Sequence, residues 1–246
     1  MTASLGASVS DSESLSSLKD TLESNTEMIQ WYTAVKAALE QLSGVSVSDV
    51  SKSKGGIKVK ISLASSLSLV IVCSSNKRGS MKVDDAILVG DPIMDPMGII
   101  RHPPPPLQDI LTHARSLPNP HDLRFVVREA RNRIDKATNK VNDLGVLRKS
   151  YEIRAEQGHL DKVKVNVIDG IMVEFSLSKD YPTGKSIKVQ SYSGCQPPDS
   201  LVNYQTAALF DDGETINSAV EKMKGVIQEL KLQDVAKGLG LADLPR

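Results

Sequence analysis

The sequence predicts an α+β protein of two modules, each an antiparallel β-meander packed by helices, with a long helix joining them. Two observations support this fold class. Segments with apolar residues three or four positions apart alternate with segments where the spacing is two. The order helix, meander, helix also occurs twice, although the two halves share no evident sequence identity. The expected divisions are a mobile arm at 1–14, a first module at 15–118, a second module at 119–233 and a loose tail at 234–246.

The first module begins with an amphipathic helix, expected from Leu15 to Leu42 with Gly44 as its C-terminal cap. After Gly44 the apolar spacing falls to two, and Gly55-Gly56 predicts a hairpin turn. Four strands are expected, near 45–50, 57–61, 66–73 and 81–89. The prolines between 92 and 106 predict irregular structure, up to a short helix at 107–116.

The second module is expected to start with a long helix that Asp122 caps and whose apolar spacing continues to Tyr151, with Gly145 kinking or ending it. Asp169-Gly170 is a strong hairpin signal between strands at 163–168 and 171–177. A third strand is expected at 187–192, a short fourth element within 201–210, and a final helix with its apolar face from Ile216 to Leu230.

Composition narrows the classes of function. The 246 residues carry 30 Lys and Arg against 30 Asp and Glu, whereas a protein that binds nucleic acid through its phosphates has a basic excess. We therefore do not expect nucleic acid as the main partner, and we interpret the basic residues of the middle helix as a solvated face. The sequence shows no secretory signal and no apolar stretch of membrane-spanning length, so we expect an intracellular protein away from the membrane.

No motif predicts catalysis, a metal or a cofactor. Gly184-Lys185-Ser186 resembles the end of a phosphate-binding loop, but Lys179 occupies the position of the required glycine, so we expect a turn. Cys73 is expected to be buried in a strand, and Cys195 has no neighbouring base to activate its thiol. Metal-ligand spacing is lacking among the four histidines, which are His102, His113, His121 and His159.

The second half resembles the RWD domain, a relative of the ubiquitin-conjugating enzyme fold that lacks the catalytic cysteine. The resemblance depends on the order helix, hairpin, third strand and closing helix, with Tyr181-Pro182 directly after the hairpin. The family has a further proline a few residues later, where this chain has Ser186 and Ile187. The first half has the same order of elements without a Tyr-Pro pair.

Two divergent RWD modules in tandem resemble kinetochore proteins, first the C-terminal region of the blinkin/Spc-seven scaffold of the KMN network and next the CENP-O and CENP-P subunits. This resemblance implies a non-enzymatic interaction module in the nucleus, which docks the scaffold onto the MIND complex and binds coiled-coil partners such as Zwint during chromosome segregation. The alternatives are an RWD-type adaptor in ubiquitin signalling and an enzyme whose active site is dispersed along the sequence.

A module of this kind captures a partner by strand addition or in a groove. We expect the first strand of the second sheet to be an exposed edge, with partner-binding candidates Val163, Val165 and Val167. The long helix contributes an apolar seam, expected to be core and alternatively a docking surface for a coiled coil, at Ile134, Val141, Leu144 and Tyr151.

Overall fold

The computed structural model describes residues 26, 28–30, 32–33, 35–37, 39, 45–53, 56–63, 66–75, 81–116, 123–156, 159–194, 198–201 and 209–239. The predicted arm at 1–14, the turn residue Gly55, the thiol of Cys195, His121 and most of the short element expected within 201–210 lie outside these residues. Within them the chain is an α+β protein with antiparallel sheets, as predicted.

The chain forms two compact units. The first comprises Met1–Gly90 and Pro106–Arg131, and the second comprises Asp91–Pro105 and Asn132–Arg246. These boundaries differ from the single division expected between 118 and 119, because the segment 91–105 contributes to the second unit before the chain completes the first. Contacts between residues far apart in the sequence decide this division, and no local pattern encodes it.

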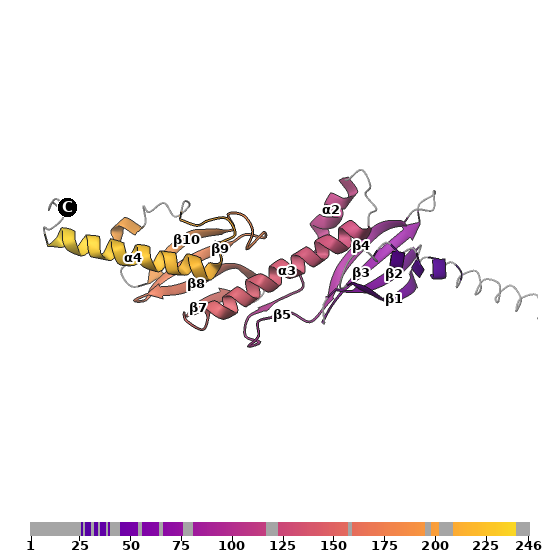
Figure 1. Ribbon diagram of the computed structural model, residues 1–246, viewed down its shortest axis with the longest axis horizontal. Coiled ribbons are helices and arrows are strands. Elements are labelled where there is room, and N and C mark those ends of the chain that lie inside the picture. The colour runs from indigo at the N-terminus through magenta and orange to yellow at the C-terminus, as the bar shows by residue number, and fades with distance from the viewer. Residues whose placement is uncertain are drawn as a thin grey trace, which may run out of the picture. The chain divides into compact units, whose positions relative to one another are not determined.

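The first unit contains the predicted four-stranded meander (Figure 1), with strands β1 (Ser46–Ser53), β2 (Gly56–Ser62), β3 (Leu67–Ser75) and β4 (Met81–Gly90) adjacent in chain order. Alternation is clear in β2, where Ile57, Val59 and Ile61 are buried and Lys58 and Lys60 are exposed. Helix α2 (Gln108–Ser116) contacts β4. The described residues from 26 to 39 are helical.

The second unit has the sheet order β10-β9-β8-β7, with strands β7 (Ile153–Glu156), β8 (His159–Ile168), β9 (Ile171–Leu177) and β10 (Ile187–Gly194). The predicted turn at Asp169-Gly170 is confirmed, and both residues have positive φ, 50° and 76°, as a two-residue hairpin requires. Strand β7 was not predicted. It places β8 inside the sheet, so the expectation that the strand carrying Val163, Val165 and Val167 forms an edge is wrong.

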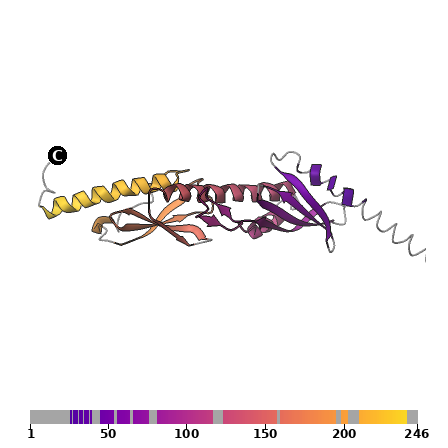
Figure 2. The ribbon, with the colours of Figure 1, turned by 90° about the horizontal axis from the view of Figure 1, so that it is seen from below.

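Helices cover one face of the second sheet, as Figure 2 shows for α4 (Ile216–Gly238). Strand β9 buries every second residue, from Ile171 to Leu177, and α4 contacts β8 through a buried apolar face. Residues Asn132–Leu147 of α3 (Leu123–Leu147) also belong to this unit. Helix α4 continues to Gly238, so the chain is still helical after Gln233, where a loose tail was expected.

The proline-rich segment is more regular than expected. It contains a two-stranded hairpin of β5 (Ile93–Met94) and β6 (Arg101–His102), in which Ile93 pairs with His102 and Met94 with Arg101. The four paired positions contain no proline, so each retains the amide donor that strand pairing uses. Within the described residues, no helix is both long enough and apolar enough to cross a membrane.

Candidate functional site

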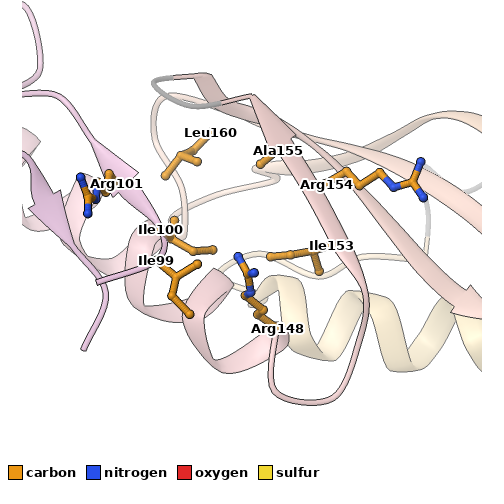
Figure 3. Close-up of a pocket in the computed structure, with 8 residues that line it drawn as sticks. All are labelled: Ile99, Ile100, Arg101, Arg148, Ile153, Arg154, Ala155 and Leu160. Atoms are coloured by element: carbon orange, nitrogen blue, oxygen red, sulfur yellow. The ribbon is translucent and has the colours of Figure 1, made fainter. Parts of the chain in front are cut away.

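A pocket of about 320 Å³ lies beside strand β7 in the second unit (Figure 3). It combines apolar walls with guanidinium groups, and its lining residues are Ile99, Ile100, Arg101, Arg148, Ile153, Arg154, Ala155 and Leu160. Three segments supply them: the β5–β6 hairpin, the loop after α3, and strand β7 with the start of β8. Apolar walls with a few oriented polar groups are typical of a binding site.

Asp95 fixes the hairpin wall of the pocket. Its buried carboxylate accepts hydrogen bonds from the amides of Met97 at 3.2 Å, Ile99 at 2.7 Å and Ile100 at 2.6 Å. Burial by itself raises the pKa of this carboxyl, but the amide hydrogen bonds together outweigh burial and hold the pKa below its usual value. The ionised carboxylate therefore sets the loop conformation that presents Ile99 and Ile100 to the pocket.

Gly145 allows the hairpin to approach α3 closely. A Cβ atom at this position would lie 2.9 Å from the Cβ of Asp95 and 3.0 Å from its Oδ2. The helix continues past Gly145 to Leu147, so the glycine neither ends α3 nor occupies its C-terminal cap. Its role is to leave room for Asp95. The sequence signal was the glycine itself, which costs about 1 kcal/mol relative to alanine inside a helix.

Three arginines border the pocket, and of these Figure 3 shows Arg148 alone between the apolar walls. Arg154 pairs with Glu152 at 2.9 Å, and the Nε of Arg101 donates to the carbonyl oxygen of Gly98 at 3.3 Å. The side chain of Arg148 has no hydrogen bond or ion pair within the part of the chain that the structure describes. Figure 3 shows Arg148 rising between Ile99 and Ile153, so its charge lies over the apolar walls.

Strand β7 is an edge of the sheet, because among the described strands it pairs with β8 alone. The amide of Asn166 donates to the carbonyl oxygen of Glu152 at 2.9 Å, which makes residues 152 and 166 a hydrogen-bonded pair. Backbone direction alternates along an antiparallel strand, so the amides and carbonyls of Ile153 and Ala155 point away from β8. On this edge of the sheet, the free main-chain groups therefore lie at two residues that also line the pocket.

The residues predicted as partner-binding lie elsewhere. Core positions of the second unit hold six of the seven, which are buried: Val163, Val165, Val167, Ile134, Val141 and Leu144. Their burial agrees with the interpretation of the helix seam as core. It also means that the three valines are not exposed to a partner. Tyr151 lies beyond the end of α3, donates a hydrogen bond to the Glu221 carboxylate, and has the ammonium of Lys224 5.8 Å from its ring centroid. Burial and Glu221 raise the pKa of Tyr151 to about 12.

Sequence reasoning missed the residues of the pocket. The one available signal was Arg148, which interrupts the apolar spacing of the helix seam between Leu144 and Tyr151. Ile153 and Ala155 lie on a strand of only four residues, too short for a period of two to be visible. Ile99 and Ile100 follow two prolines and reach the pocket only because Asp95 shapes the loop.

Tyr181 links three segments of the second unit. Its buried hydroxyl donates to the Oδ2 of Asp143 on α3 at 2.6 Å and accepts from the amide of Ile216, the first residue of α4, at 2.9 Å. The Tyr181-Pro182 peptide bond is cis. Burial and the hydrogen bond to Asp143 raise the pKa of Tyr181, against a smaller opposite effect of the Ile216 amide. This arrangement gives Tyr181 a structural role.

Two basic residues of the middle helix are neutralised within the second unit. Lys136 pairs with Asp180 at 2.8 Å, and the buried ammonium of Lys140 pairs with Asp161 at 2.7 Å. The hydrogen bond from Lys136 lowers the pKa of Asp180. These lysines therefore hold α3 to the sheet and its loops, which accounts for part of the basic character of the helix.

Other candidate groups are placed as follows. Cys73 is buried, and burial together with the charge of Asp84 raises the pKa of its thiol to about 12. Gly184, with φ of 65°, lies in the turn before β10, and a strand follows where a phosphate-binding loop needs a helix. No cluster of three or more His, Cys, Asp or Glu suited to a metal ion occurs among the described residues.

The fold and the pocket define an α+β protein of two antiparallel meanders, one of which presents an edge strand beside an apolar, arginine-bordered hollow. No family model, no curated protein and no solved structure matches this chain.

Proposed function

We propose that this chain is a non-enzymatic protein–protein interaction module, with tandem RWD-like units, which docks a kinetochore scaffold onto the MIND complex. One observation carries the proposal: each unit contains a four-stranded antiparallel meander, and in the second unit Tyr181-Pro182 follows β9 as in the RWD family. The kinetochore assignment depends on the resemblance of the tandem arrangement described above, and a nuclear, centromeric location follows from it.

The second unit contains what a docking module requires. Its sheet has an edge strand with free main-chain groups at Ile153 and Ala155, and a pocket with apolar walls lies beside them. Partners that add a strand gain affinity from main-chain hydrogen bonds and specificity from side-chain pockets. The buried helix seam contributes to stability, and recognition is assigned to the edge.

Binding to purified MIND complex tests this function. We expect the full chain to co-elute with MIND in size-exclusion chromatography and to bind it in calorimetry, and a Zwint-type coiled coil is the second partner to test. Ubiquitin and a ubiquitin-conjugating enzyme are the comparison ligands. Binding to either of them without binding to MIND would overturn the kinetochore assignment and favour an adaptor in ubiquitin signalling.

Localisation provides an independent test. A fluorescent fusion of the full chain is expected to form foci that coincide with a centromere marker in dividing cells. A uniform distribution throughout mitosis would contradict the proposed location.

A further inference from the structure

We infer that the pocket beside β7 binds a short acidic and apolar peptide segment of a protein partner, which adds to the sheet as a strand along β7. The inference rests on the proposed function in one respect, that the partner is a protein. It goes further by assigning the surface, the chemistry of the partner segment and the residues that recognise it.

The main chain of β7 argues for an extended ligand. Ile153 and Ala155 direct their amides and carbonyls away from β8, and each free group can pair with a peptide strand. Because hydrogen-bonded positions recur every two residues along an antiparallel strand, Ile153 and Ala155 are two successive pairing positions. A peptide that pairs with both places alternate side chains on the pocket side of the sheet.

The pocket walls argue for an apolar side chain in the ligand. Ile99 is 40% exposed although it lines the pocket, and its neighbours on the wall are Ile100, Ile153 and Leu160. A volume of about 320 Å³ exceeds one aliphatic side chain and suits two from successive alternate positions. Burying them removes apolar surface from water on both partners.

The charge at the pocket mouth argues for an acidic ligand. Arg148 lies between Ile99 and Ile153 and has no ion pair among the described residues. Arg154, in contrast, pairs with Glu152, and Figure 3 shows its side chain directed away from the other lining residues. A guanidinium binds a carboxylate through two parallel hydrogen bonds, a geometry that also selects against basic residues. Glutamate or aspartate next to the apolar positions therefore complements the site.

The experiment uses the full chain and a fluorescein-labelled seven-residue peptide that alternates valine with glutamate. Its comparison peptides replace every glutamate with lysine, or N-methylate alternate backbone nitrogens. We expect fluorescence polarisation to show saturable binding of the acidic peptide. The N-methylated peptide should bind with an affinity lower by about tenfold or more, and the basic peptide should bind most weakly. Equal affinity for all three would overturn the inference.

Matched variants locate the binding surface. Arg148→Glu should weaken binding of the acidic peptide at least about tenfold, whereas Lys149→Glu makes the same charge change one residue away, outside the pocket lining. Ile99→Ser should weaken binding about fivefold, and Met97→Ser is its control because Met97 is 61% exposed on the same hairpin without lining the pocket. Equal losses within either pair would show that the pocket is not the binding surface.

Hydrogen exchange tests the strand addition itself. The amides of Ile153 and Ala155 should exchange more slowly when the acidic peptide is bound, while the amide of Arg154 already faces β8 and should change little. Binding without this pattern would overturn strand addition. Self-association of the peptide-free chain in sedimentation that Arg148→Glu abolishes would instead identify a second copy of the chain as the occupant and overturn the inference.

The two proposals can fail separately. If MIND binds the chain and Arg148→Glu leaves that binding unchanged, the assignment of this pocket fails and the proposed function stands. If the acidic peptide binds at the pocket and MIND does not, the kinetochore assignment fails and the pocket stands.

Discussion

Two glycines on helices of the second unit provide a test in which the same change, glycine to alanine, should have opposite effects on the free energy of unfolding. Gly145→Ala and Gly225→Ala both replace a helical glycine with the best helix former, which by itself stabilises a helix by about 1 kcal/mol. Around Gly225, apart from its two chain neighbours and the backbone of its own helix, no described atom lies within 4 Å of the added Cβ. Gly225→Ala should therefore raise the free energy of unfolding by about 1 kcal/mol.

At Gly145 the added Cβ would lie 2.9 Å from the Cβ of Asp95, closer than ordinary non-bonded contact. Asp95 cannot move away without lengthening its hydrogen bonds to Ile99 and Ile100. Overpacking costs about 1–3 kcal/mol, and weakening a buried charge-assisted hydrogen bond costs about as much. After the helix gain is subtracted, we expect Gly145→Ala to lower the free energy of unfolding by up to about 2 kcal/mol.

Urea unfolding of the full chain, followed by circular dichroism at 222 nm, measures both variants on the same unit. The two variants should differ in free energy of unfolding by about 1–3 kcal/mol, and the amide shifts of Ile99 and Ile100 should change only in Gly145→Ala. The penalty should shrink in an Asp95→Gly background, because the opposing side chain is then missing. Equal stabilisation by the two alanines would refute the close approach of the hairpin to α3.

Three further predictions concern individual groups. Tyr181→Phe should destabilise the second unit by about 1–3 kcal/mol in urea unfolding, because it leaves the buried amide of Ile216 without its acceptor. The more exposed Tyr151→Phe should cost less than about 1 kcal/mol, and equal costs would contradict the role of burial. Because the pKa of Asp95 is lower in the folded state, its ionised carboxylate stabilises the fold at pH values above the unfolded-state pKa. This stabilisation is lost as the pH falls through the folded-state pKa. The difference in free energy of unfolding between the native chain and Asp95→Asn should therefore decrease from roughly pH 6 to roughly pH 2.5. With its pKa raised to about 12, Cys73 should resist a thiol reagent at about pH 8 until urea unfolds the chain, as measured in a Cys195→Ser variant; rapid labelling of the folded protein would argue against its burial.

Local features of the sequence determined the fold class and most of the strands. The alternation of Ile57, Val59 and Ile61 with lysines places one face of β2 in the core, and Asp169-Gly170 supplies the positive φ angles that a tight hairpin needs. These features could be predicted because they depend on residues within a few positions of one another. The helix seam could be recognised as core for the same reason.

The tertiary structure decided where the exposed edge and the pocket lie. Strand β7 has too few residues for its period to be visible in the sequence, yet it pairs with β8 and so removes the strand that carries the buried Val163 from the edge of the sheet. The hairpin at 93–102 belongs to the second unit because Asp95 organises its loop and Gly145, fifty positions away, leaves space for it. The sequence alone thus determined most of the segments that form helices and strands, since these depend on neighbouring residues, but it did not reveal β5, β6 or β7. Only packing between distant segments decided which surface is left open for a partner.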